Sequence, residues 1–206
     1  MRCTLQLEKA LWRQGYARVA GVDEAGRGSL FGPVAASAVI LSPDSPIRGL
    51  NDSKLLTSEE RSRLAPIIRE RAAAWAVAFV DAAEIDRINI LQASRLAMWR
   101  ALDQITPPCD YILADAVSLD YPAPQRSLIK GDARVACIAA ASILAKVERD
   151  AVLDHFDAEF PGYGLAHHKG YSTPEHLEAL ARLGPSPLHR RSYEPVSRLL
   201  QGELWR

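Results

Sequence analysis

Four carboxylates stand where apolar runs of the chain end. Asp23 and Glu24 follow "ARVAGV", Asp115 follows "YILA" and Asp132 follows "RSLIKG". Carboxylates seldom lie at the border of a core unless something offsets their charge. Hard divalent ions such as Mg²⁺ and Mn²⁺ prefer oxygen ligands of this kind. Two such ions about 3.5–4 Å apart can activate a water and stabilise a leaving oxygen in phosphodiester cleavage.

Each of these acids also has an ordinary structural interpretation. Asp23 and Glu24 suit a turn, and Asp132 suits the N-cap of the helix predicted after it. Asp115 has acidic neighbours that look like loop residues, but it continues an apolar strand. Functional groups of open α/β sheets gather at strand ends, so the common placement of the four favours one shared site.

A glycine turn, "GRG", follows the acidic pair. Gly26 and Gly28 allow the backbone to approach a ligand closely. Arg27 between them presents a planar set of donors to a phosphate or hydroxyl. A tight hairpin with a solvated arginine is the plainer alternative.

Further candidate contacts lie downstream. In "HHKGYSTPEH", Tyr171 and Lys169 suit stacking on a sugar or base beside a bound phosphate, although a core tyrosine fits the pattern equally well. Ser142 and Lys146 lie four residues apart on one face of a predicted helix, where both could touch a phosphate. Alternatively, Lys146 pairs with Asp150. The adjacent histidines are not predicted as metal ligands, because sequence neighbours rarely bind one ion.

The elements that must position these groups follow from apolar periodicity and from helix and strand breakers. Strands are predicted at 17–22, 33–41, 75–80, 111–116 and 126–131, and helices at 4–15, 56–74, 88–105 and 133–160. The remainder is predicted as loop and short helices. This order indicates an α/β protein in which helices flank a mixed sheet.

Composition bounds the class of protein. A chain of 206 residues, 48% hydrophobic and 24% charged, fits one globular domain at 1–206, with about 161–206 as a small helical C-terminal extension. The net charge of zero shows no overall basic field. Three scattered cysteines give no zinc spacing and favour a reducing, cytoplasmic location. We expect no signal peptide and no membrane span.

In sequence order, several motifs resemble those of bacterial ribonuclease HII, the type 2 RNase H. They are "GVDEAGRG", "LNDSK", "LADA", "KGDARVACIAAASILAKVERD", "HHKGYSTPEH" and "GPSPLHRRSY". The resemblance covers nearly the whole chain and implies an RNase H-like fold with a five-stranded mixed sheet. It implies an endonuclease that hydrolyses the RNA strand of RNA–DNA hybrids. It also implies cutting 5′ of single ribonucleotides in DNA duplexes, with 5′-phosphate and 3′-hydroxyl products.

The resemblance also implies a role for each candidate residue. Asp23, Glu24, Asp115 and Asp132 would bind two Mn²⁺ or Mg²⁺ ions and carry the catalysis. Gly26, Arg27 and Gly28 would recognise the ribose 2′-hydroxyl, the group that distinguishes RNA from DNA, and Tyr171 would stack on the following deoxyribose. Lys54, Ser142, Lys146 and Lys169 would contact backbone phosphates.

The chain departs from the family pattern at three positions. Ser29 and Phe31 replace the proline and alanine that usually follow the turn, and Leu55 replaces a second lysine. We expect Phe31 to alter packing behind the turn, and Leu55 to remove one phosphate contact. The C-terminal "QGELWR" resembles peptides that dock on sliding clamps, but an ordinary helix end fits it better. We predict a monomer; a sliding-clamp contact is compatible with this peptide, but nothing else in the sequence supports it.

Two other functions are compatible with parts of this pattern. A phosphate-binding ATPase or sugar kinase of similar fold would need a second glycine-rich phosphate turn, for which "IKGDAR" is a poor candidate. A non-catalytic nucleic-acid-binding module would bind without divalent ions and tolerate Asp132→Asn. The motif series favours the nuclease.

Overall fold

The computed structural model describes residues 3–202. Its strands are β1 (Val19–Ala25), β2 (Val34–Leu41), β3 (Ala72–Val80), β4 (Tyr111–Asp115) and β5 (Gln125–Leu128). Its helices are α1 (Gln6–Arg13), α2 (Ser58–Arg71), α3 (Ala82–Ile88), α4 (Ile90–Gln104), α5 (Ala136–Glu159), α6 (Leu165–His168), α7 (Pro174–Leu183) and α8 (Glu194–Leu200). Each predicted strand and long helix is present, with shifted ends.

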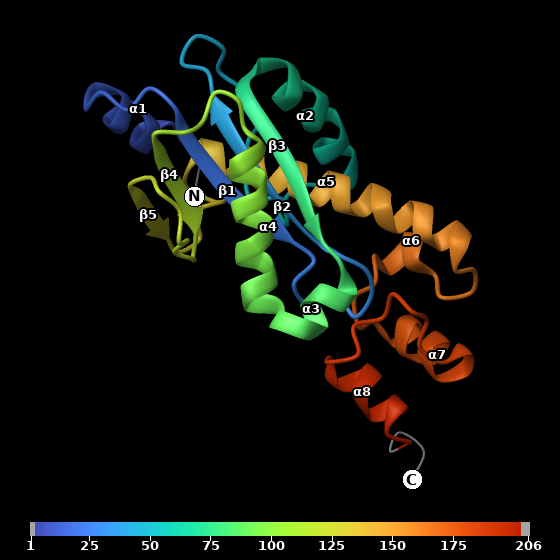
Figure 1. Cartoon of the computed structure of the whole chain (residues 1–206). Helices are drawn as coiled ribbons and strands as arrows, with labels where there is room; N and C mark the ends of the chain where they lie inside the picture. The colour runs from blue at the N-terminus through green and yellow to red at the C-terminus, as the bar shows by residue number, and fades with distance from the viewer. Residues whose placement is uncertain (1–2, 203–206) are drawn as a thin grey trace.

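The sheet has the order β3-β2-β1-β4-β5. β1 pairs antiparallel with β2 and parallel with β4, and β4 pairs parallel with β5. The sheet is therefore mixed and five-stranded, as the resemblance implied. Figure 1 shows α4 crossing one face while α5 lies behind the other.

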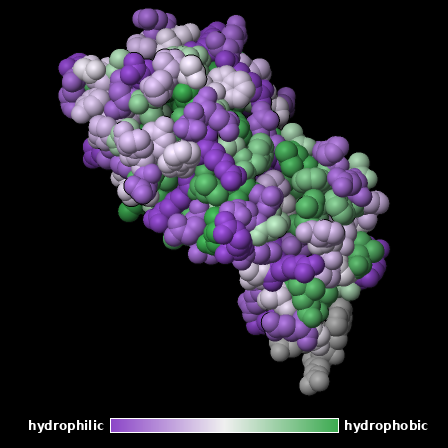
Figure 2. Space-filling view, viewed as in Figure 1, coloured by the Kyte–Doolittle hydropathy of each residue, from purple (hydrophilic) through white to green (hydrophobic). Residues whose placement is uncertain are grey.

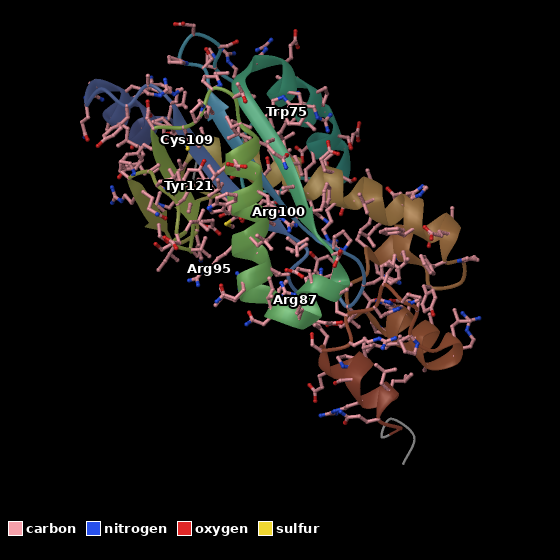
Figure 3. The ribbon with its side chains drawn as sticks, in the orientation of Figure 1. Trp75, Arg87, Arg95, Arg100, Cys109 and Tyr121 are labelled. Carbon is pink, nitrogen blue, oxygen red and sulfur yellow. The ribbon has the colours of Figure 1, made fainter. Side chains whose placement is uncertain are left out.

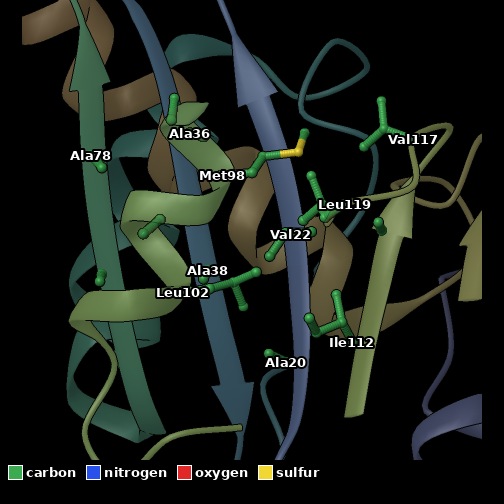
Figure 4. Packing of buried hydrophobic residues seen from close by; sticks show 14 of the residues in the cluster. Ala20, Val22, Ala36, Ala38, Ala78, Met98, Leu102, Ile112, Val117 and Leu119 are labelled. Atoms are coloured by element: carbon green, nitrogen blue, oxygen red, sulfur yellow. The ribbon is translucent and has the colours of Figure 1, made fainter. Parts of the chain in front are cut away.

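Two apolar cores lie on the two faces of the sheet. Figure 4 shows the α4 side, where Met98 and Leu102 pack onto Val22 and Ile112. On the other side α5 lies very close to β1: a Cβ added at Gly21 would stand 2.2 Å from the carbonyl carbon of Cys137. Only glycine fits there, so α5 and the end of β1 are held at one short separation.

Two predicted boundaries were wrong. The helix predicted at 56–74 ends at Arg71, because Ala72 and Ala74 pair with β2 and extend β3 beyond the predicted 75–80. The helix predicted at 88–105 begins at Ile90, after a separate short helix, α3. Asn89, with φ of 66°, separates the two and caps α4 with its side chain. Tertiary pairing and one left-handed residue decided these ends.

The helices α6–α8 follow α5 and form the end of the described chain, drawn orange to red in Figure 1. Phe31 joins them to the sheet: it is fully buried, and its ring lies 5.9 Å from Phe156 and 4.9 Å from His189 between centroids. The bulky departure predicted to change packing behind the turn is thus a core residue of this junction.

Figure 2 shows polar and apolar residues interspersed over the visible face.

Candidate active site

Asp23 lies near the end of β1 and is only 5% exposed. Burial raises the pKa of Asp23 well above its usual range, and repulsion from Glu24 and Asp115 raises it further. Such a carboxylate is stabilised in its ionised form by a nearby cation.

Glu24 has one occupied and one free oxygen. Arg27 Nη1 donates to Glu24 Oε1 at 3.2 Å, whereas the buried Oε2 has no hydrogen-bond partner among residues 3–202. Burial raises the pKa of Glu24, although Arg27 opposes this rise. A buried oxygen without a partner is costly unless a ligand completes its surroundings, and here the ligand would be cationic.

Asp115 lies beside Asp23 because β1 and β4 are parallel. Val22 pairs with Ala114, so the next residue of each strand is one of the two carboxylates. The N–H of Gly131 donates to Asp115 Oδ1 at 2.6 Å. This bond holds the loop after β5, and with it Asp132, against the end of β4.

Asp132 does not cap the following helix. That helix, α5, begins at Ala136 with Val135 as its N-cap, and Asp132 instead accepts from its own neighbour, the N–H of Ala133, at 2.9 Å. Asp132 is 4% exposed. Burial raises its pKa, Asp115 adds to the rise, and Lys54 opposes it.

The four acids form an open cluster. Asp115 raises the pKa of each of the other three by repulsion. Within residues 3–202, however, no three His, Cys, Asp or Glu side chains stand close enough together to enclose a metal ion. An all-oxygen donor set, with raised pKa values at Asp23, Glu24 and Asp132 and a free Glu24 oxygen, fits a divalent cation whose remaining ligands come from substrate.

The two glycines of the turn differ in what surrounds them. Gly26 has φ of +92°, and a Cβ there would lie 1.9 Å from Arg149 Nε. Gly28 has open space, with only the Tyr171 ring at 4.0 Å. Gly26 is therefore required for packing and backbone conformation, while Gly28 leaves room for a ligand beside Tyr171.

Tyr171 is half-buried next to this turn and belongs to neither sheet core. It forms a bridge with Ser29, and Lys146 Nζ and the Arg149 guanidinium lie 5.7 and 5.5 Å from its ring centroid. Since the Lys146 ammonium already lies over this ring, the surroundings are favourable for an anionic ligand.

Of the residues predicted to contact phosphates, two lysines are paired with aspartates and one serine is buried. Lys146 pairs with Asp150 at 2.6 Å, the alternative that the sequence left open, and Lys169 pairs with Asp154. Ser142 is buried rather than at the surface, and its hydroxyl oxygen lies 2.8 Å from that of Ser53.

Lys54 is exposed near the acids. Partial burial lowers its pKa, but attraction to Asp132, Asp23 and Asp115 outweighs this, so its pKa is raised on balance. Leu55 beside it is 69% exposed. The side chain at the position of the usual second lysine therefore points into solvent and packs against no core.

Sequence reasoning missed two arginines behind the turn. Arg149 and Arg190 are fully buried, and their guanidiniums donate to backbone carbonyls around the turn. No spacing in the sequence distinguishes them from solvated arginines on α5 and in the C-terminal segment. Only their complete burial identifies them.

A groove on the far side of α4 is separate from this site. It has a volume of about 990 Å³ and is lined by Arg87, Arg95, Trp99 and residues after β4, and by none of the four carboxylates. Figure 3 shows the arginines of α3 and α4 on this side. Arg87 is already paired there with Glu84.

Comparison with known proteins agrees with this arrangement. A family model described as Ribonuclease HII matches residues 20–196. A ribonuclease HII of Solibacter usitatus is 60% identical over 195 residues, covering 95% of this chain and 86% of that protein. One from Geobacillus kaustophilus is 49% identical, covering 96% and 76%.

Solved structures agree at the level of the fold. The crystal structure of ribonuclease H2 from Pyrococcus horikoshii OT3 superposes with a TM-score of 0.76 and 27% identity, covering 92% of this chain and 100% of that one. The sheet order, the strand-end carboxylates and the sequence match together establish the family. This chain belongs to the ribonuclease HII family and is an RNase H type 2 endonuclease.

Proposed function

We propose that this protein hydrolyses the RNA strand of RNA–DNA hybrids and cuts on the 5′ side of single ribonucleotides embedded in duplex DNA. The products carry 5′-phosphate and 3′-hydroxyl ends, and the activity serves ribonucleotide excision repair. One observation carries this proposal: Gly28, on the turn that directly follows Asp23 and Glu24, faces open space in which an added Cβ would meet only the Tyr171 ring, at 4.0 Å. A ribose held against Gly28 would place its phosphate near the acids.

Mn²⁺ or Mg²⁺ is the proposed cofactor, with two ions in the catalytic complex. Asp23, Glu24, Asp115 and Asp132 would hold them, and a cation would give the buried Oε2 of Glu24 the partner that it lacks among residues 3–202. Such ions, when bound, supply an activated water and stabilise charge on the leaving oxygen. A structural relative of 22% identity and TM-score 0.73, Bst-RNase HIII, is known in complex with Mn²⁺.

The protein's own groups would bind and orient the substrate. The Gly28 backbone would meet the ribose 2′-hydroxyl, with Gly26 and Arg27 shaping the turn, and Tyr171 would stack on the next deoxyribose. Lys54, Lys146 and Lys169 would contact phosphates, the last two by exchanging an aspartate partner for a phosphate. Ser142 would act near Asp23, whose pKa is raised by burial and lowered in part by Ser142.

The test uses a labelled DNA duplex that contains one ribonucleotide, incubated with Mg²⁺, Mn²⁺ or EDTA. We expect metal-dependent cutting 5′ of the ribonucleotide, no cutting of the all-DNA duplex, and loss of cutting in Asp132→Asn. The matched control is Asp120→Asn, because Asp120 is an exposed acid in the loop after β4. Folded protein that leaves the duplex intact, or Asp132→Asn with full activity, would refute the proposal.

We further propose that the chain acts as one domain, 1–206, with 161–206 as its helical extension, and works as a monomer in the cytoplasm. The three cysteines are free thiols, as a reducing compartment allows. No helix within residues 3–202 is long and apolar enough to cross a membrane.

An Archaeoglobus fulgidus RNase HII, 27% identical at TM-score 0.69, forms a complex with PCNA. The last four residues of "QGELWR" lie outside the described part of this chain, and we propose no clamp contact.

A further inference from the structure

Two buried arginines hold the backbone that follows the Gly26–Gly28 turn, at residues 31–33, and the Lys169 carbonyl beside it. Arg149 of α5 donates to the carbonyls of Pro33 at 3.1 Å, Phe31 at 3.3 Å and Lys169 at 3.1 Å. Arg190 donates to the carbonyl of Gly32 at 3.0 Å. All four carbonyls thus turn inward, toward the two guanidiniums.

The carbonyl of Arg27 is held most directly. It accepts from Arg190 Nη1 at 2.9 Å and from the Tyr193 hydroxyl, which itself lies 3.0 Å from Arg190 Nη1. A trans peptide unit is planar, and its C=O and N–H point in opposite directions. The only cis bond within residues 3–202 is Thr106–Pro107. The N–H of Gly28 therefore points away from Arg190, toward the open side of the turn.

The two guanidiniums are charged groups buried without a direct ion-pair partner within residues 3–202. Both are 0% exposed, and neither forms an ion pair with any carboxylate in the part of the chain that the structure describes. Arg190 Nη2 is buried without a hydrogen-bond partner in that part. Burial lowers the pKa of Arg149 to about 10, so it stays protonated at neutral pH. Two positive charges in a low-dielectric setting attract an anion bound on the other side of the turn.

Gly26 shows how closely this support is fitted. Its φ of +92° places its α-carbon directly on the Arg149 side chain, where an added Cβ would lie 1.9 Å from Nε. The turn therefore has one arginine beneath its first glycine and another behind its central carbonyl. A shift of either side chain would release the orientation of the Arg27–Gly28 peptide.

From these contacts we infer that Arg149 and Arg190, with Tyr193, are positioning residues: they bind the carbonyl of Arg27 and those of residues 31–33, so that the Gly28 N–H and a net positive potential face the ribonucleotide and its phosphate. The inference rests on the proposed function of the turn. It assigns the selectivity for a ribonucleotide partly to side chains that touch no substrate atom.

The test compares four variants in the Asp132→Asn background, which separates binding from cutting. Tyr193→Phe removes one hydroxyl from the Arg27 carbonyl. Arg190→Lys and Arg149→Lys keep a positive charge but lose the planar set of donors. The control is Arg182→Gln, since Arg182 is exposed and donates to the Gly162 carbonyl elsewhere in the C-terminal segment.

The readout is the ratio of affinities for a duplex with one ribonucleotide and the same duplex of DNA only. We expect this ratio to fall about 3-fold to 10-fold in Tyr193→Phe and about 10-fold to 100-fold in the lysine variants, in line with one neutral or one charged hydrogen bond. Affinity for the all-DNA duplex should change less than about 2-fold on the same basis, because the turn's contact to the 2′-hydroxyl is absent there. Arg182→Gln should keep the ratio.

An unchanged ratio in variants with wild-type thermal midpoints would overturn the inference, as would an equal fall in Arg182→Gln. If the lysine variants fail to fold, Tyr193→Phe decides, because it removes a single partly exposed hydroxyl. A parent protein that shows no preference for the ribonucleotide would instead refute the proposed function, and this inference with it. The two failures are thus distinguishable.

Discussion

Glu8 of α1 is a fully buried carboxylate at the start of the long helix α5. Its Oε1 accepts from the N–H of Cys137 at 2.8 Å, whereas the N-cap Val135 has no side chain able to do so. Burial raises the pKa of Glu8, and hydrogen bonds from the helix lower it in part. The residue therefore caps a helix that lies 129 positions away, and this helix carries Ser142 and follows directly after Asp132.

Two substitutions of Glu8 should distinguish the contribution of its hydrogen bond to stability from the contribution of its charge. Glu8→Ala leaves the Cys137 N–H buried without a partner, and we expect a loss of about 1–3 kcal/mol of unfolding free energy. Glu8→Gln keeps an acceptor oxygen and needs no buried charge, so it should cost less. Chemical denaturation of both variants measures this difference. Equal losses would show that the carboxylate charge, rather than hydrogen bonding, stabilises the helix start.

At the scale of elements, three histidines tie the loop around Tyr171 to α7. Ser186 N–H donates to His189 Nδ1, so His189 Nε2 donates to His176 Nε2 at 3.2 Å, and His176 Nδ1 donates to the Tyr171 carbonyl at 3.0 Å. His168 stacks on His176 with centroids 4.4 Å apart. The rings of His176 and His189 need to be neutral for this chain of bonds. Of the two adjacent histidines of the motif, the buried His168 has a structural role, whereas His167 is exposed.

Acid should weaken this part of the structure in a defined window. Burial lowers the pKa of His176 to about 4 and that of His189 to about 3, below the unfolded value of about 6.5. The unfolded chain therefore binds more protons below pH 6.5. The contribution of these two histidines to the free energy of unfolding is fully present above that pH. It is lost as pH falls toward 4, by up to about 1.4 kcal/mol per pH unit for each histidine.

Denaturation of the wild type and of His189→Asn across pH 4–8 checks this prediction. Asp23, Glu24 and Asp132 have raised pKa values and act in the opposite direction, so the informative quantity is the difference between the two proteins. The excess of the wild type over His189→Asn in free energy of unfolding should shrink as pH falls. His155→Gln, an exposed histidine of α5, serves as control. A difference that does not change with pH would contradict the prediction.

At the scale of the whole molecule, a neutral chain concentrates opposite charges at one site. Acids gather at the ends of β1, β4 and β5, while Arg149 and Arg190 lie buried behind the turn. The acids repel one another, and part of the folding free energy is spent on holding them together without a cation. This arrangement favours substrate phosphates that arrive together with divalent ions.

Metal should therefore stabilise the folded protein. We expect millimolar Mn²⁺ to raise the thermal midpoint by several degrees relative to EDTA, as about 2–3 kcal/mol of ligand binding would do for a chain of this length. Asp115→Asn should remove most of this shift, because Asp115 repels the other three acids. Differential scanning fluorimetry gives the comparison. A midpoint indifferent to Mn²⁺ would argue against a metal site formed before substrate binds.

The amino-acid sequence by itself determined the order of strands and helices and the candidate acids at strand ends. Apolar runs and breakers are local signals, and they are strong in "YILADA" and in the alanine-rich α5. The motif series added the family, which the comparisons confirmed. Roles of single residues in binding and catalysis remain predictions for the experiments above.

Tertiary structure alone decided contacts between residues far apart in the chain. Three such contacts depend on which segments meet in space. They are the carbonyl partners of Arg149 and Arg190, the cap that Glu8 provides for α5, and the different space around Gly26 and Gly28. Strand pairing also extended β3 to Ala72 against local helix preference. Local patterns specify elements, whereas burial and hydrogen-bond partners belong to the assembled fold, so they cannot be read from spacing.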